Sequence, residues 1–485
     1  MNSFSEKDLC LIAQMKRFFE CTEADRSFAN ALNDDSGKHD VRKRMRDIGI
    51  AFEPQALAPL WKQPDKASRY WDWVFDGKDT LKIDGDLEAD LKTHPMLHLW
   101  AAWLRARTQM VNTNASDVPD TEMIRRFHAW RQRRIAATQS ELGHYADQID
   151  HPIFAFELSK GCSMSCAFCG FSSEKLSAVF DDTPENRRLW SQIVRDGYAM
   201  FGDAACGALC YYATEPYDNA HYLDFIKDYK MITGAVVCTA TAAPLHDPAW
   251  LRRLIRFYRE GPDPWPRISV LSLPILRKIH DTYSPDELRD VTLLLQMKNA
   301  PRMKAKSGRT RHYKNEHLGG LKIPKGAAFI PQGSIACVSG FLVNMVDKTI
   351  KLVSPCYASN QWPHGYREFA KTTFEDAKSY RAAIEKMVET HMPENPLPDS
   401  RLAFRDDLRF ENQPNGFLLL SPNKKHHIGG HPVFKEIGAI VDKGTYSYRQ
   451  VMESLLKNDT SMVDIDLSLK MLYDKGLLDE TNTAR

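Results

Sequence analysis

The chain of 485 residues carries a net charge of +2, and 43% of its residues are hydrophobic. These values are ordinary for a globular protein, and the length allows roughly three domain-sized units. A charge this close to neutral does not predict a nucleic-acid partner, and no apolar stretch is long enough to cross a membrane. We therefore expect neither nucleic acid nor a membrane as a partner.

Residues 1–150 are expected to form an N-terminal helical domain. Apolar residues recur at helical spacing in 8–19, 96–111 and 123–138. Because apolar stripes usually become core, a packed cap is favoured over a peptide-docking surface.

From residue 151, short apolar segments alternate with amphipathic ones. The pattern predicts strands at 153–158, 208–212, 235–239 and 268–272, separated by helices at 184–201, 222–231 and 249–259. Repeated strand–helix units indicate an α/β fold with a parallel sheet covered by helices. In barrels of this kind, the chemistry lies at the carboxyl ends of the strands.

Three cysteines follow the first strand in a C-x3-C-x2-C run: Cys162, Cys166 and Cys169. Thiolates are the usual ligands of iron–sulfur clusters, and three of them leave one iron of a [4Fe–4S] cube open. A zinc site would need a fourth ligand, and a buried group of thiols or a disulfide would also produce closely spaced cysteines. The motif and the spare cysteines together favour a cluster protein of a reducing cytoplasm.

With Phe168 directly before its last cysteine, this run resembles the motif of the radical SAM superfamily. The resemblance covers about residues 150–300 and implies a partial (β/α)6 barrel. It also implies a [4Fe–4S] cluster on the three cysteines, S-adenosylmethionine (SAM) on the open iron, and an external one-electron reductant of flavodoxin or ferredoxin type. Phe168 would lie near the adenine of SAM.

The segment Ala213-Thr214-Glu215-Pro216 follows the second strand and resembles the Gly-Gly-Glu-Pro element of that superfamily. The resemblance implies that these four residues bind the SAM amino group, with Glu215 paired to the ammonium. Ala213 and Thr214 depart from the pattern where glycine lets a ligand approach the backbone. An ordinary strand-to-helix turn is the alternative.

Hydroxyl side chains follow the next two strands, at Thr239, Thr241 and Ser272. They are candidates to bind the ribose or carboxylate of SAM, and solvated turn residues are the alternative.

Residues 298–325 form a basic stretch. A solvated loop is the favoured interpretation, and a strip that steers an acidic peptide is the alternative.

A period-two pattern predicts a hairpin of 341–346 and 349–354, which leads into Ser354-Pro355-Cys356. The segment from Ser354 to Tyr366, together with Glu157 to Cys162, resembles the radical SAM peptide epimerases of proteusin-type ribosomal peptide maturation. The resemblance implies an isomerase that converts L to D residues in a precursor peptide bearing a leader. A 5′-deoxyadenosyl radical would abstract the α-hydrogen, and a cysteine thiol would return a hydrogen.

Cys356 is the preferred hydrogen donor and Cys337 the second choice. Cys356 follows a hairpin behind a rigid proline, so we expect it to be more exposed than a core cysteine. Small buried apolar positions are expected for the remaining cysteines, Cys10, Cys21, Cys206, Cys210 and Cys238.

The expected organisation is a helical domain at 1–150 and a barrel with its hairpin at 151–370. A helical and loop connection follows at 371–420, and a winged-helix-like domain at 421–485. In that last domain, Ser447 and Gln450 fit a capping box. Such units recognise leader peptides in several maturation systems, and a small packing domain is the alternative.

Two other functions compete with epimerisation. Radical SAM enzymes that crosslink peptides or form thioethers usually carry cysteine-rich C-terminal extensions, and here no cysteine follows Cys356. A non-catalytic metal-binding protein is the third possibility, and SAM cleavage distinguishes it from both enzymes.

Overall fold

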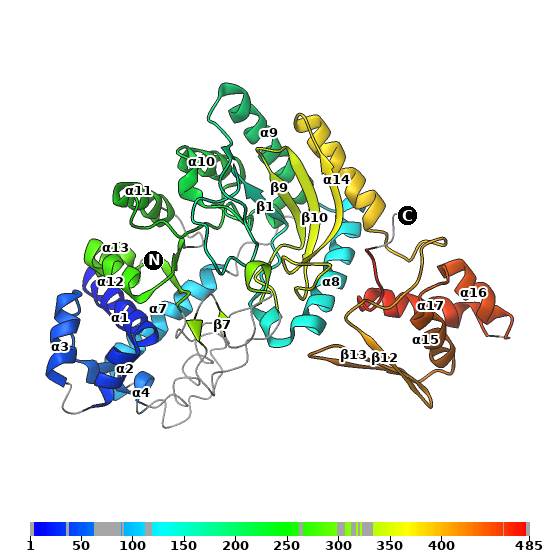
Figure 1. The fold of residues 1–485 in the computed structure, drawn as a ribbon, viewed down its shortest axis with the longest axis horizontal. Helices are drawn as coiled ribbons and strands as arrows, with labels where there is room; N and C mark the ends of the chain where they lie inside the picture. Colours follow the sequence, from blue (N-terminus) through cyan, green and yellow to red (C-terminus); the bar gives the residue numbers. More distant parts are fainter. Residues whose placement is uncertain are drawn as a thin grey trace. The chain divides into compact units, whose positions relative to one another are not determined.

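The computed structural model describes residues 4–34, 38–62, 89, 92–111, 119–260, 265–297, 306–311, 317–318, 321–322, 333–458 and 460–481. These residues form a mixed α/β fold with several small sheets, none of which closes into a barrel within the described part (Figure 1). The α/β prediction is thus confirmed. The chain divides into two compact units, Met1–Ser116 with Cys238–Met303, and Asp117–Val237 with Lys304–Arg485.

The first unit combines N-terminal helices with a small parallel sheet. Its N-terminal helices are α1 (Glu6–Ala24), α2 (Arg26–Asn33), α3 (Lys38–Asp47), η2 (Pro54–Leu57), α4 (Ala58–Trp61) and α7 (Pro95–Val111). The sheet has the order β4 (Ala240–Thr241), β5 (Arg267–Val270), β6 (Thr292–Leu295), with helices α11 (Pro248–Arg259), α12 (Leu273–Thr282) and α13 (Pro285–Leu288). Apolar residues of α1, α2, α3 and α7 share one core, so the described residues before 112 are helical, as expected.

The second unit is built around a four-stranded sheet of order β1 (Phe154–Glu157), β9 (Gly340–Asn344), β10 (Thr349–Pro355), β11 (Tyr366–Thr373). Strands β9 and β10 form the predicted hairpin, and β1 pairs in parallel with β9. Its helices are α8 (Glu122–Leu142), η3 (Gly143–Gln148), α9 (Pro184–Phe201), η4 (Gly202–Ala205), η5 (Pro216–Asp218), α10 (Tyr222–Thr233) and α14 (Ala377–His391). Helix α9 packs against α10 and α14, and α14 also contacts β11.

Two short strand pairs complete this part, β2 (Ser159–Lys160) with β3 (Ala178–Val179), and β7 (His317–Leu318) with β8 (Leu321–Lys322). The 3-10 turn η6 (Gly308–Thr310) precedes β7 in sequence.

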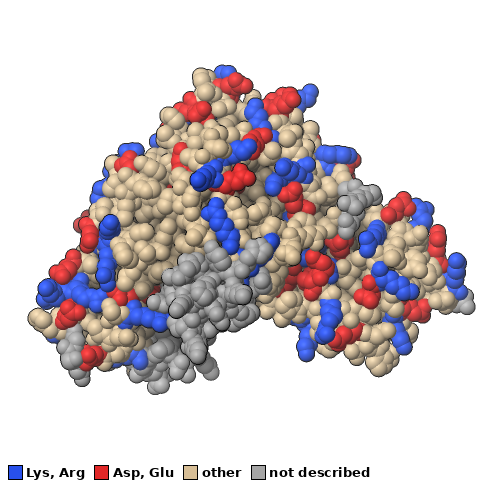
Figure 2. Space-filling view, viewed as in Figure 1, with Lys and Arg blue, Asp and Glu red and all other residues tan. Residues whose placement is uncertain are grey.

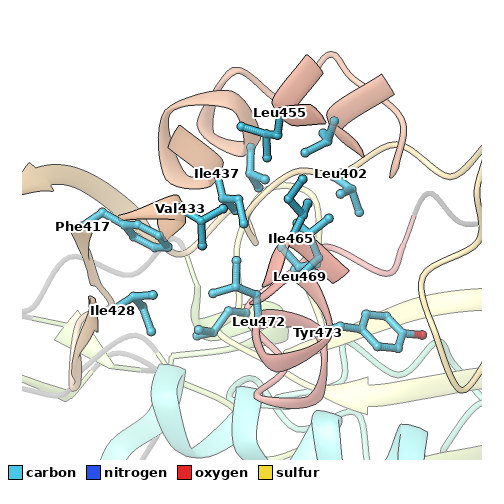
Figure 3. Packing of buried hydrophobic residues seen from close by; sticks show 14 of the residues in the cluster. Leu402, Phe417, Ile428, Val433, Ile437, Leu455, Ile465, Leu469, Leu472 and Tyr473 are labelled. Atoms are coloured by element: carbon cyan, nitrogen blue, oxygen red, sulfur yellow. The ribbon is translucent and has the colours of Figure 1, made fainter. Parts of the chain in front are cut away.

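The C-terminal part is a three-stranded antiparallel sheet followed by three helices. The elements are β12 (Arg409–Gln413), β13 (Gly416–Leu420), β14 (Lys425–Gly429), α15 (Val433–Lys443), α16 (Tyr448–Leu456) and α17 (Met462–Asp474). Figure 3 shows apolar side chains of the strands and of all three helices converging on one core, including Phe417, Ile437, Leu455 and Leu469. The predicted capping box of Ser447 and Gln450 opens α16. The boundary expected at 421 falls between β13 and β14, and the four-domain division stays a prediction.

Two strands differ from expectation. The segment 208–212 makes only an isolated bridge, from Leu209 to Ala155, and β4 lies at 240–241 instead of 235–239. Apolar periodicity alone marks a buried segment without fixing which residues pair, because pairing depends on neighbours far away in sequence.

None of the described helices is both long and apolar enough to cross a membrane. On the face shown in Figure 2, acidic and basic side chains are intermixed among the residues that are coloured.

Candidate functional site

The three motif cysteines lie on a loop that follows β1 at its carboxyl end. Gly161 opens the loop with φ +82°, and a Cβ there would lie 2.3 Å from the carbonyl oxygen of Lys175. The Cys162 amide donates to the Glu174 carbonyl at 2.9 Å, which closes the loop on itself. A glycine is therefore required where the two ends of the loop meet.

The sulfur atoms of this cysteine loop, defined here as residues 161–175, are partly buried and influence one another. Burial raises the pKa of the Cys162 thiol to about 11, with smaller contributions from Glu215, Asp218 and Cys166. Burial also raises the pKa of Cys166, and the Cys169 thiol adds to that effect. The fold thus brings the three cysteines close to one another, and a metal would have to displace the protons of the Cys162 and Cys166 thiols.

The distances between these sulfur atoms indicate which kind of metal group the three thiols fit. Among the described residues, the three cysteines do not form a group whose ligand atoms all lie within 4.8 Å of one another. A single tetrahedral zinc with bonds of about 2.3 Å draws its sulfurs closer together than that. Three thiolates around a larger polynuclear cluster fit this arrangement better.

The segment that resembles Gly-Gly-Glu-Pro lies beside the cysteine loop. Ala213 adopts φ +55°, a left-handed conformation that glycine would adopt without strain, and its carbonyl accepts from Ser173 Oγ at 2.7 Å. Glu215 is buried, and its Oε1 accepts from the Tyr217 amide at 3.1 Å. Thr214 is half-buried, and Pro216 is buried at the start of η5. Although Ala213 replaces the first glycine of the Gly-Gly-Glu-Pro element, its backbone therefore has the left-handed conformation that glycine favours.

Aromatic contacts distinguish the two phenylalanines of the cysteine loop. Phe168 is 36% exposed, whereas Phe171 packs on Tyr212 with ring centroids 4.4 Å apart. The Tyr212 hydroxyl is buried, and it has no hydrogen-bond partner among the described residues. Tyr212 also lies 6.3 Å from the ring of Tyr366 in the epimerase-like segment.

The three residues whose hydroxyls are candidates to bind SAM, Thr239, Thr241 and Ser272, belong to the first unit. Thr239 and Thr241 are buried beside and within β4, so neither is a solvated turn residue. Ser272 caps α12 through its hydroxyl, which accepts from the Ile275 amide at 3.4 Å.

Two site residues were missed by the sequence reasoning. Glu157 ends β1 opposite Asn344 of β9, whose amide donates to its carboxyl at 2.9 Å. Burial raises the pKa of Glu157 to about 7. In the sequence, the only signal for Glu157 was its position as a polar residue at the end of an apolar strand.

The second missed residue is Arg309. Its Nη1 donates to the Cys166 carbonyl at 2.6 Å, and its Nη2 donates to the Ser173 carbonyl. The expectation of a solvated basic loop is wrong for residues 306–311, where Lys306, Ser307 and Thr310 are buried. Within 298–325, only these residues and the β7 and β8 pairs lie inside the described part of the chain. Nothing in the local sequence distinguished Arg309 from its basic neighbours.

The two candidate hydrogen donors occupy different surroundings. Cys356 is fully buried, and its amide donates to the Gly365 carbonyl at 3.0 Å. The expectation of a relatively exposed Cys356 is therefore wrong, because β10 and β11 stay paired up to its neighbour Pro355. Burial raises the pKa of its thiol, and charged groups including Arg367 and Glu141 act on it. Cys337 is only partly buried, and burial first, then the nearby Cys337 thiol, raises the pKa of Tyr212.

Of the remaining cysteines, Cys210 is buried as expected, whereas Cys10 is exposed and the others are intermediate. Cys10 lies on the surface of α1, so the expectation of a core position is wrong for it.

Comparison with known proteins places the chain in a family. No family model matches it, and no solved structure matches it. The uncharacterized protein y4wI of Sinorhizobium fredii is 33% identical over 475 residues, which cover 97% of this chain and 87% of that protein. Its name states no activity, so the likeness carries no function to this chain. At this identity and coverage, the chain belongs to the same protein family as y4wI.

Proposed function

We propose that this protein is a radical SAM peptide epimerase, an isomerase that converts L residues of a ribosomally made precursor peptide to D residues. The observation that carries the proposal is the cysteine loop. It holds three partly buried thiols behind a parallel strand, next to a buried carboxylate. The proposed architecture is a partial (β/α)6 barrel, and the parallel pairs of β1 with β9 and of β4, β5 and β6 support it.

Cys162, Cys166 and Cys169 would hold the [4Fe–4S] cluster. When bound, the reduced cluster and SAM supply the 5′-deoxyadenosyl radical that removes a hydrogen atom from the peptide. The chain itself orients the ligands. Glu215 is the proposed partner of the SAM ammonium, since its charge acts on the Cys162 and Cys166 thiols and so lies near them. The other SAM contacts stay predictions, as does the flavodoxin- or ferredoxin-type reductant.

Inversion needs a hydrogen donor on the face of the substrate carbon opposite to abstraction. Cys356 is proposed as this donor: its S–H bond breaks, a C–H bond forms, and the thiyl left on Sγ regains an electron and a proton from an external reductant. The thiol is completely buried, so donation to the peptide requires that Sγ become accessible to the substrate carbon. Cys337 is the alternative, supported by its partial exposure and by its closeness to Tyr212, which packs on the cysteine loop.

The C-terminal part is proposed to bind the leader of the precursor peptide. Strand β14 is an edge strand of its sheet, and an extended peptide can pair with such an edge. Helix α17 exposes Met462, Val463 and Leu467, each more than 60% accessible. Backbone pairing together with an apolar helix face is a common way to hold a peptide.

The experiment that tests this proposal measures the hydrogen atom that is returned to the α-carbon of the peptide. The reconstituted and reduced chain is incubated in heavy water with SAM and a leader-bearing precursor peptide. The proposal predicts D residues, each carrying one deuterium at the α-carbon. A peptide that returns with only L residues and no crosslink, while SAM is consumed, would contradict epimerisation.

A further inference from the structure

Residues 306–311 contact the cysteine loop from far away in sequence. Gly308 has φ +55°, and a Cβ there would lie 2.4 Å from the carbonyl carbon and oxygen of Gly170. A Cβ on Gly170 would in turn lie 2.8 Å from Ser307 Oγ. The two backbones therefore touch at Gly308, where any side chain would force them apart, whereas a side chain at Gly170 would displace those of Ile335 and Ser307.

Arg309 uses this close approach to bind the cysteine loop at three carbonyl oxygens. Its backbone amide donates to Cys169 at 3.0 Å. Its guanidinium donates to Cys166 at 2.6 Å and also to Ser173. The planar, fork-shaped guanidinium can serve two carbonyls at once, which the single ammonium of lysine cannot do with the same geometry.

The same short segment is anchored on its other side. The Gly308 amide donates to the Pro363 carbonyl at 2.8 Å, and Arg311 Nη1 donates to the Ser359 carbonyl at 2.5 Å. Both acceptors lie in the segment after Cys356. Arg309 is thus held from two directions, and its charge is fixed in place beside Cys166.

We propose that Arg309 is a positioning residue that holds the cysteine loop in its ligating conformation and places a fixed positive charge beside the cluster. The inference rests on the proposed function. Adding an electron makes a thiolate-bound cluster more negative, so a nearby cation favours the reduced form. Iron–sulfur potentials depend on such charges and hydrogen bonds around the cluster.

The first test uses the full chain without metal. Arg309→Lys should speed amide hydrogen exchange in residues 161–175, because lysine keeps the charge and loses the two-carbonyl contact. Arg311→Lys is the matched control, since the Arg311 guanidinium donates to the Ser359 carbonyl, whereas that of Arg309 donates to Cys166 and Ser173. Exchange in 161–175 that stays at the wild-type rate in Arg309→Lys would overturn the positioning role.

The second test measures the cluster potential after anaerobic reconstitution, by electron paramagnetic resonance at set potentials. Arg309→Gln should lower the ratio of reduced to oxidised cluster about tenfold at a fixed potential, which is about 59 mV for one electron. Arg309→Lys and Arg311→Gln should stay near wild type. Equal potentials in all four proteins, or the same shift in Arg309→Lys and Arg309→Gln, would overturn the charge effect.

These results separate the two proposals. Wild-type chain that takes up no iron and sulfide would contradict the proposed function, and this inference with it. Wild-type chain that holds a cluster, with Arg309 variants indistinguishable from it, would contradict this inference alone.

Discussion

At the scale of single residues, the cysteine spacing predicted a shared site, and the fold does bring Cys162, Cys166 and Cys169 together. The spacing could do this because all three lie within one short loop. The contacts of Arg309 could not be predicted, since 143 positions separate it from Cys166. The exposure of Cys356 was misjudged for a related reason, because the strand that covers it comes later in the chain.

The identity of the hydrogen donor is a prediction at this scale. In Cys356→Ala, SAM cleavage should persist while D residues and deuterium incorporation are lost, because abstraction does not need the thiol. Cys337→Ala is the matched comparison and should still give D product. Chiral amino-acid analysis with mass spectrometry of the peptide checks both. D product from Cys356→Ala, with none from Cys337→Ala, would transfer the role to Cys337.

At the scale of elements, local signals were sufficient for helices and for the hairpin. Thr183 caps α9 and Pro184 occupies its first turn, so the start of that helix could be read from neighbouring residues. The parallel pairing of β1 with β9 could not be predicted from neighbouring residues, since no local pattern specifies a partner strand so far along the chain. The Glu157–Asn344 contact depends on that pairing and was missed with it.

His151, which precedes β1, gives a pH-dependent prediction. It is buried with Nδ1 2.8 Å from Ser339 Oγ, and burial followed by the charge of Arg131 lowers its pKa to about 4. The unfolded chain therefore binds this proton more readily. The resulting stability is complete above an ordinary histidine pKa of about 6.5 and falls by up to about 3 kcal/mol as the pH drops toward 4.

His151→Asn tests this. Asparagine tolerates the positive φ of +51° at this position and cannot titrate. The variant should lose less stability than wild type between pH 7 and pH 4.5 in urea unfolding. Identical losses of unfolding free energy in the two proteins would show that His151 does not contribute to the pH dependence of stability.

The exposed face of α17 gives a prediction about peptide binding. Leu467 is 61% exposed, so Leu467→Glu should leave the free energy of unfolding within about 0.5 kcal/mol of wild type. It should weaken binding of the precursor peptide about tenfold, because a charge replaces an apolar contact. Met231→Glu on α10 is the control, since Met231 is 77% exposed on a different element. Equal binding by both variants would remove α17 from the interface.

At the scale of the whole molecule, the second unit is tied together by buried ion pairs between distant segments. Glu480 near the C-terminus accepts from Arg133 Nη2 of α8 at 2.9 Å and from Arg134 of the same helix. All three side chains are at most 2% exposed. Burial alone would raise the pKa of Glu480, but the two arginines hold it below the ordinary value.

Glu480→Gln should therefore destabilise the protein by about 3–5 kcal/mol, because it leaves two buried guanidinium groups without a compensating charge. Glu453→Gln, on the exposed surface of α16, is the control and should be near neutral. Chemical unfolding measures the difference. A Glu480→Gln protein as stable as the control would show that the buried network contributes little.

The central claim is that the cysteine loop holds a cluster that cleaves SAM. The most direct measurement is the formation of 5′-deoxyadenosine from SAM by the anaerobically reconstituted, reduced full chain. We predict cleavage by wild type and by Cys10→Ala, which changes an exposed cysteine outside the motif. We predict none after replacement of Cys162, Cys166 and Cys169 by alanine. Cleavage by that triple variant, or no cleavage by a wild-type chain that holds iron and sulfide, would contradict the account.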